Sequence, residues 1–214
     1  MVDVVLDEES MDTIYKESRS FRALDHHKTA LKFLANKPYV FLDMKKSGAG
    51  LAWDEIIQTS RPFLIDLVED RDLWNWKIEG SRDYLMVPDS LPLDFDAWDA
   101  FSKRLENPQS RADVLREGQA ISNFFNTQLE KIAPHATDMV DQGLSGATIN
   151  VPYLLASEMG NFLCRTKNKD FAFTWFLRTD GQIQGSWRSE KMDILHLAEK
   201  FGGGGHPRAC GARM

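Results

Sequence analysis

Two histidines directly after an aspartate, Asp25-His26-His27, are the first group of residues able to do chemistry. Neutral imidazole and carboxylate are ligands for manganese, zinc or iron, and a carboxylate can also orient a ligating ring through its other nitrogen. A pair of surface histidines at the start of a helix is the plainer alternative. The chain has 5 histidines, and His26, His27 and His206 all lie in this motif and one other. The pattern therefore predicts a metal site.

The second group is a run of four glycines, Gly202 to Gly205, that ends in His206 near the C-terminus. Because glycine loses the most backbone entropy on ordering, the run is predicted to be neither helix nor strand interior. A backbone free to adopt positive φ can turn several N–H groups toward one point and bind a phosphate, beside which the imidazole adds a donor or a charge. The alternatives are a flexible tail and the end of a helix.

Together, Asp25-His26-His27 and the terminal glycine-histidine run resemble the DHH phosphoesterase superfamily, and more narrowly its members with a C-terminal DHH-associated domain of the first type. The stretches from Asp43 to Trp53 and from Val68 to Trp74 are similar to a phosphohydrolase subgroup found in bacteria and phages. The resemblance covers nearly the whole chain. It implies an enzyme that hydrolyses phosphoester bonds with a metal-activated water. The alternative is a nucleotide-binding module that does not cleave its ligand.

The resemblance also implies the ligands of the metal. Asp3 stands 22 residues before Asp25, at the place of a family ligand that ends a strand ahead of the motif. His26 matches the ligating histidine, and Asp70 matches the aspartate of the fourth motif. Asp72 is a rival in the same acidic run, and we prefer Asp70.

Asp25, His26 and His27 are the predicted catalytic residues, with Asp25 and His27 supporting the metal or contacting substrate. Two divalent ions about 4 Å apart would produce the attacking hydroxide and neutralise the phosphoryl oxygens. We expect Mn²⁺ in preference to Mg²⁺, since Mg²⁺ favours oxygen over nitrogen ligands. The family's first motif, a histidine and aspartate cluster after the first strand, has no counterpart in the chain. We therefore expect fewer metal ligands than a two-metal site needs, and a sheet that is incomplete at its N-terminal side.

Substrate binding is predicted for the C-terminal third. By resemblance, Gly203, Gly204, Gly205 and His206 would hold a phosphate. Arg188, at a strand end, matches a family arginine and could make a bidentate phosphate contact, although an exposed strand-end arginine is an equally good interpretation. The implied substrates are short oligonucleotides, cyclic dinucleotides or nucleoside phosphates.

The elements that must position these residues alternate in type. Apolar runs at residues 2–6, 21–24 and 39–44 predict strands, and helical patterns follow at residues 8–16 and from residue 48, where the segment 47–50 is expected to cap a helix near the metal site. Such alternation predicts an α/β fold with a doubly wound, mostly parallel sheet, and it puts Asp25 at the C-terminal end of a buried strand, where ligands bind in such sheets. Residues 62–68 form a helix or strand that delivers Glu69-Asp70, and residues 88–108 are expected to be irregular.

A long helix over residues 111–132 is a candidate connector to a small α+β domain. That domain is predicted from a strand at 147–155, a helix at 157–164, a hairpin of 171–177 with 182–188, and a helix at 194–201 that Asp193 can cap. We therefore expect a phosphoesterase domain at 1–108, a connector at 109–135 and a substrate-binding domain at 136–214.

Composition limits the partners. A net charge of −6 argues against a broad track for long duplexes and favours a short nucleic acid or a small phosphorylated nucleotide. Two cysteines are too few for a disulfide framework, and the N-terminus has no signal-peptide pattern, so a cytoplasmic location is expected. No apolar run is long enough to span a membrane. An exposed sheet edge would favour a homodimer.

Overall fold

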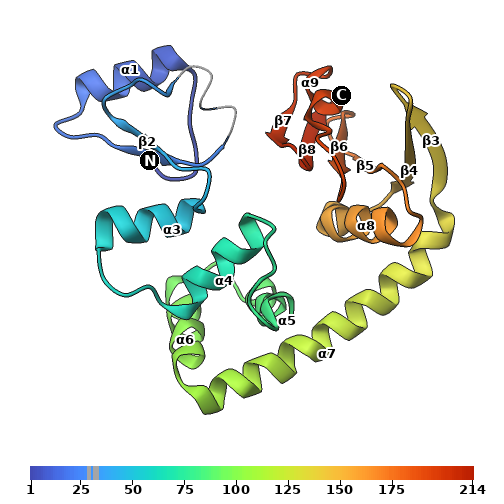
Figure 1. Ribbon diagram of the computed structural model, residues 1–214, viewed down its shortest axis with the longest axis horizontal. Coiled ribbons are helices and arrows are strands. Elements are labelled where there is room, and N and C mark those ends of the chain that lie inside the picture. The colour runs from blue at the N-terminus through green and yellow to red at the C-terminus, as the bar shows by residue number, and fades with distance from the viewer. Residues whose placement is uncertain (28–29, 31–33) are drawn as a thin grey trace. The chain divides into compact units, whose positions relative to one another are not determined.

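The computed structural model describes residues 1–27, 30 and 34–214, which divide into two units, residues 1–125 and 126–214. The helix α7 (Pro108–Ile132) contributes residues to both units (Figure 1). This helix includes the predicted connector helix, although the boundary between the units falls inside it. Pro108 is its first residue, a position where proline loses no helical hydrogen bond.

The N-terminal unit contains a two-stranded parallel sheet of β1 (Ala23–Asp25) and β2 (Val40–Leu42). The helix α1 (Glu8–Glu17) packs on these strands through Met11, which is fully buried (Figure 1). The predicted strand at 2–6 is reduced to a single parallel bridge from Val2 to Leu24. The reason is the left-handed backbone of Asp3, whose φ is 60°, which an extended strand cannot contain.

The rest of this unit is helical, and the helices enclose an apolar core that includes Leu67, Leu85 and Phe101. They are α3 (Gly48–Ala52), continued by a π-helical turn at Trp53–Ile57, then α4 (Phe63–Asp72), α5 (Ser81–Met86), a 3₁₀ turn at Pro88–Ser90, and α6 (Phe95–Glu106). The prediction of irregular structure over 88–108 is wrong for most of its length. The helix α6 fills it because Asp94 caps the first turn, accepting the N–H of Ala97 at 3.0 Å.

The C-terminal unit is built on a mixed six-stranded sheet with the strand order β3-β4-β5-β6-β8-β7. Its strands are β3 (Thr137–Asp141), β4 (Leu144–Asn150), β5 (Phe171–Leu177), β6 (Ile183–Arg188), β7 (Gly204–His206) and β8 (Ala209–Arg213). Only β4 and β5 pair in parallel, joined by the helix α8 (Tyr153–Thr166). The 3₁₀ turn Ala133–His135 precedes β3, and α9 (Leu195–Glu199) precedes β7.

Side chains alternate between the faces of this sheet and so divide its core. Thr174 of β5 donates to the carbonyl of Ala156 in α8 at 3.1 Å, so one face packs on α8. On the other face, Phe171 of β5 and Trp187 of β6 belong to an apolar cluster that includes residues of α9. The chain is thus an α/β protein, but its large sheet is mixed and lies in the C-terminal unit, whereas the predicted parallel sheet is represented by two strands. No helix among the described residues is long and apolar enough to span a bilayer.

Candidate functional site

The motif Asp25-His26-His27 lies at the C-terminal end of β1, and its first two residues are buried. The Oδ1 atom of Asp25 accepts the backbone N–H groups of His26 at 2.6 Å and His27 at 3.0 Å, and it lies 2.7 Å from Nδ1 of His27. An ionised carboxylate only accepts hydrogen bonds, so the proton of the neutral His27 ring is on Nδ1 and the lone pair is on Nε2. The aspartate therefore fixes the backbone turn and the orientation of the second histidine.

Two further carboxylates meet at the first histidine. Nε2 of His26 lies 3.0 Å from Oδ1 of Asp3 and 3.2 Å from Oδ2 of Asp72. The imidazole is almost completely buried, with 1% of its side chain exposed, while the side chains of Asp3 and Asp72 are 48% and 34% exposed. Two carboxylates this close repel each other unless a proton or a cation lies between them.

The arrangement fits a divalent cation. Ligand atoms of Asp3, Asp25 and His27 lie within 4.8 Å of one another. The Oδ2 atom of Asp25 is buried and has no hydrogen-bond donor among the residues that the structure describes. A buried carboxylate oxygen without a donor is costly, and a metal ion is one of the few groups that would stabilise it.

The acidic and histidine side chains of the cluster stabilise each other in their charged forms, which shifts their pKa values. Burial opposes the protonation of His26, but the hydrogen bond with Asp3 and the charge of Asp72 outweigh it and raise its pKa. The hydrogen bond with Asp25 raises the pKa of His27. Burial acts to raise the pKa of Asp25, yet hydrogen bonds from His27 and His26 prevail and lower it. The site therefore attracts a positive charge, which is either a proton or a metal ion.

Asp70 does not join this cluster. It is 5% exposed, and its two oxygens accept the backbone N–H groups of Lys77 at 2.8 Å and Ile78 at 3.2 Å, closing the loop after α4. Residues two apart on a helix point about 200° away from each other, so only one of Asp70 and Asp72 can face His26. The structure places Asp72 there, so the geometry favours Asp72 over Asp70, which we prefer from the sequence alone. The spacing of residues along α4 could have predicted this outcome from the sequence. Asp70 lies on the same buried face of the helix as Leu64 and Leu67.

The glycines of the segment 47–50 make the cluster possible. Ser47 caps α3 by accepting the N–H of Gly50 at 3.0 Å, as the sequence predicted. A Cβ atom at Gly48 would lie 2.5 Å from Cβ of Asp3. The backbone of α3 therefore touches the side chain of Asp3 directly, and any larger residue at position 48 would displace it.

The glycine run of the C-terminal unit is more ordered than predicted. Gly202, with φ 72°, and Gly203 end α9 by donating to the carbonyls of Glu199 at 2.9 Å and Ala198 at 3.0 Å. The N–H of Gly203 is thus already used, which corrects its predicted role in a phosphate nest. Gly204, Gly205 and His206 form β7 and pair with β8, so the expectation that the run cannot be strand is also wrong.

A strand of glycines forms here because β7 and β8 approach each other too closely for side chains. A Cβ atom at Gly203 would lie 2.2 Å from the carbonyl oxygen of Gly211, and one at Gly205, whose φ is 134°, would lie 2.7 Å from that of Ala209. His206 follows at the end of this edge strand, half-buried. The run serves as close-packed backbone that presents a histidine at its end.

Arg188 ends β6 and extends along α8. Its Nε and Nη2 atoms donate to Oγ of Ser157, both at 3.1 Å, and Nη1 donates to the carbonyl of Trp187 at 2.8 Å. Among the described residues, no carboxylate forms an ion pair with it within 4.0 Å, and burial lowers its pKa. A half-buried guanidinium that forms no ion pair with a described carboxylate is suited to bind an anion, although the charge of Glu158 acts on it from a longer distance.

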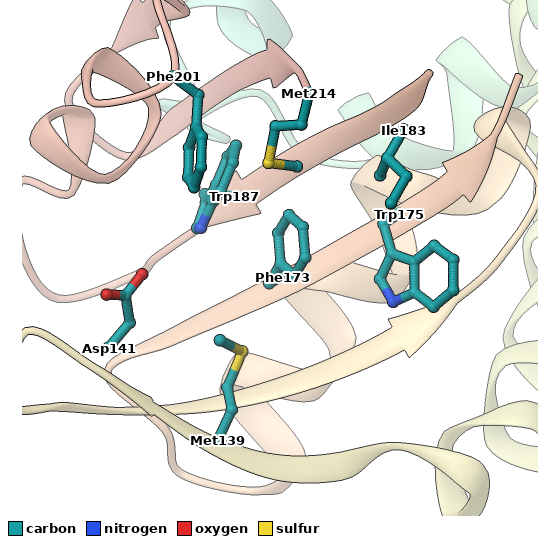
Figure 2. Close-up of a pocket in the computed structure, with 8 residues that line it drawn as sticks. All are labelled: Met139, Asp141, Phe173, Trp175, Ile183, Trp187, Phe201 and Met214. Atoms are coloured by element: carbon teal, nitrogen blue, oxygen red, sulfur yellow. The ribbon is translucent and has the colours of Figure 1, made fainter. Parts of the chain in front are cut away.

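The face of the sheet opposite α8 contains an apolar pocket of about 270 Å³ (Figure 2). It is lined by Met139, Asp141, Phe173, Trp175, Ile183, Trp187, Phe201 and Met214. The rings of Phe173 and Trp187 lie 4.6 Å apart, and Trp187 stacks on Phe201 at 6.0 Å. Trp187 is a core residue with 2% exposure, whereas Trp175 is half-buried and accessible.

A comparison with protein families supports the resemblance that the glycine run with His206 suggests at the C-terminus. Residues 149–214 match the DHHA1 domain. The C-terminal unit therefore contains a DHHA1 domain, and the predicted resemblance is confirmed at this end of the chain. An uncharacterized protein of Acanthamoeba polyphaga mimivirus is 24% identical over 206 residues, which are 92% of this chain and 48% of that protein. The chain thus spans about half the length of this curated relative.

Three solved structures resemble this chain in their backbone arrangement, each with a low TM-score. Exonuclease RecJ bound to manganese has a TM-score of 0.48 at 14% identity, covering 100% of this chain and 70% of RecJ. The pGpG-specific phosphodiesterase PggH of Vibrio cholerae has a TM-score of 0.43 at 14% identity, covering 99% and 83%. An exopolyphosphatase-related protein of Bacteroides fragilis has a TM-score of 0.48 at 17% identity, covering 100% and 65%. With TM-scores below 0.5, none of these likenesses determines the function of this chain.

Proposed function

We propose that this chain acts as a metal-dependent phosphoesterase of the DHH type, with Mn²⁺ as the preferred ion. The observation that carries the proposal is the meeting of Asp3, His26 and Asp72 in a chain that also contains a DHHA1 domain. Nearby, a buried oxygen of Asp25 has no donor among the described residues. Asp3, Asp25, His26 and Asp72 would hold the ion. When bound, it would supply the charge that lowers the pKa of a water and neutralises phosphoryl oxygens.

The residues of the chain have separate tasks in this proposal. Asp25 holds the ring of His27 through Nδ1, so that Nε2 is directed away from the aspartate. The side chain of His27 is 30% exposed, against 1% for His26, so it is the histidine that a substrate can reach. With its raised pKa, His27 can hold a proton near neutral pH and pass it to a leaving oxygen.

The C-terminal unit would bind the substrate phosphate. Arg188 offers a cation without a carboxylate partner among the described residues, and His206 ends the strand that follows Gly203. The N–H of Gly203 is bonded to α9, so we assign the backbone contribution to Gly204 and Gly205 only. The substrates that suit this chemistry are short oligonucleotides, cyclic dinucleotides and nucleoside phosphates.

The direct test is hydrolysis of a dinucleotide with Mn²⁺ and with EDTA. We expect Mn²⁺-dependent release of mononucleotide that His26→Ala abolishes. His135→Ala is the matched control, because this histidine is exposed in the turn before β3 and lies outside the cluster. Hydrolysis that continues in EDTA, or that survives His26→Ala, would contradict the proposal.

Nucleotide binding without cleavage is the second candidate function, favoured by the aromatic pocket of the C-terminal unit. Stacking of a base on an aromatic side chain contributes about 1–3 kcal/mol. We expect mononucleotides to quench tryptophan fluorescence and Trp175→Leu to weaken their binding about tenfold. Binding without Mn²⁺-dependent hydrolysis would support this candidate over the first, and unchanged binding by Trp175→Leu would remove the pocket from it.

A further inference from the structure

We propose that Arg61 and Glu69 form a clamp that positions the metal ligands Asp3 and Asp72. The clamp consists of Asp54, Arg61, Glu69 and the backbone N–H of Ser47. The proposal rests on the proposed metal site, but it concerns residues outside it.

The clamp is centred on a guanidinium in the loop before α4. Nε and Nη2 of Arg61 donate to the two oxygens of Asp54 at 2.8 and 2.6 Å, and Nη1 donates to Oε1 of Glu69 at 2.8 Å. The side chains of Arg61 and Glu69 are 18% and 19% exposed. This two-pronged geometry requires arginine, since lysine has no planar fork of donors.

The carboxylate of Glu69 joins two helices. Its Oε2 atom accepts the N–H of Ser47 at 2.9 Å, at the residue that caps α3. A Cβ atom at Gly50 would lie 2.1 Å from this oxygen, so α3 can approach Glu69 only because position 50 is glycine. The orientation of α3 relative to α4 therefore depends on Glu69, which Arg61 holds in place.

Both helices lead to proposed ligands. On α3, Gly48 touches the side chain of Asp3, which is otherwise half exposed and stands on a left-handed backbone. On α4, Asp72 lies one turn beyond Glu69. A shift of α3 against α4 would thus change the separation of the two carboxylates at His26. Residues that orient metal ligands from behind typically change metal affinity by about 10–100-fold when mutated.

The first test measures Mn²⁺ affinity of the full chain by calorimetry. Arg61→Gln and Glu69→Gln are each expected to weaken binding about tenfold or more. Because Arg61 acts through Glu69, the double variant should bind no more weakly than the weaker single variant. Arg61→Lys should recover part of the loss. Arg104→Gln is the matched control, since it breaks the exposed ion pair with Glu117 elsewhere in the same unit and should leave the affinity within about twofold.

Unchanged affinity in both single variants, or losses that multiply in the double variant, would overturn the clamp. A second test needs no metal and follows hydrogen exchange in EDTA. The amides of Leu51, bonded to Ser47, and of Asp3, bonded to Leu24, should exchange about tenfold faster in Arg61→Gln and at the original rate in Arg104→Gln. Faster exchange at Leu51 with no change at Asp3 would refute the coupling. If the native protein binds no Mn²⁺, the proposed function fails, and this exchange experiment still decides the clamp.

Discussion

The His26 cluster of the N-terminal unit, which we propose as a metal site, and the glycine segment of the C-terminal unit are built in opposite ways. In the cluster, side chains from three separate segments, Asp3, His26 and Asp72, meet at one nitrogen. In the glycine segment, the contacts are between backbones, and they exist because side chains are absent. A side-chain site fails when one functional group changes, whereas a backbone site fails when an atom is added. The four predictions below use this difference.

The largest effect is expected from Asp72→Asn, compared with Asp70→Asn. The first removes a charge that faces His26 and should weaken Mn²⁺ binding about hundredfold, at the upper end of the range for groups that support a metal. The second puts an amide donor against the N–H of Lys77 or Ile78, which should lower the free energy of unfolding by about 1–3 kcal/mol and leave Mn²⁺ affinity near its original value. Calorimetric titration and chemical denaturation measure both quantities. The reverse pattern would restore Asp70 as the ligand.

The second prediction concerns added atoms in the C-terminal unit. Gly203→Ala should lower the free energy of unfolding by about 2–3 kcal/mol, because the new methyl group would overlap the carbonyl oxygen of Gly211 at 2.2 Å. Gly181→Ala is the control with open space and a φ of 82°, and it should cost about 1 kcal/mol from backbone strain alone. Denaturation of the full chain compares the two. Equal losses would show that close packing does not govern the glycine segment.

The third prediction is a pH dependence of the cluster. The pKa values of His26 and His27 are raised in the folded protein, so protonation stabilises the metal-free fold. This contribution is fully present below the ordinary histidine pKa of about 6.5 and is lost as the pH rises through the raised values. In the proposed site, Mn²⁺ competes with the proton of His26, so its affinity should rise over the same range. Thermal denaturation in EDTA and in Mn²⁺ across neutral pH tests both trends, and metal-free stability that increases with pH would contradict the first.

The smallest effect is expected at the cysteines of the C-terminal unit. Cys164 and Cys210 are buried, and burial raises the pKa of each thiol to about 11. We therefore expect no measurable reaction of the native protein with a disulfide reagent near neutral pH, and reaction of both thiols after unfolding. Rapid modification of either cysteine in the native protein would show that this unit also contains a reactive side chain.

Elements with a strong local signal were predictable from sequence. The periodic apolar residues of α7 and the hairpin of β5 with β6 depend on neighbours in the chain, and the sequence predicts both. The capping of α3 by Ser47, and the bond from Asp193 to the N–H of Leu195, are also local. The helix α6 was missed because its flanking prolines suggested irregular structure, although Asp94 carried a capping signal.

The strand β3 was missed although it pairs with β4 across the two-residue turn Gln142-Gly143, which is a local hairpin. The strands β7 and β8 were missed for a different reason. The strand β8 pairs with β6, which is distant in sequence, and β7 pairs through backbone that glycine alone permits. Strand propensity is mostly the fit of side chains to a sheet that already exists, so it carries little information for a strand such as Gly204–His206.

The chemical identity of the proposed site was present in the sequence alone, since Asp25-His26-His27 and the glycine run with His206 restricted it to metal and phosphate chemistry. The choice between Asp70 and Asp72 depended on tertiary structure, because the two residues are neighbours in the chain but lie on opposite sides of α4. The same holds for Gly203, whose N–H is available to a ligand as far as the sequence shows but is bonded to the carbonyl of Ala198 in α9. Sequence determines which functional groups are available, and long-range packing determines which of them face one another.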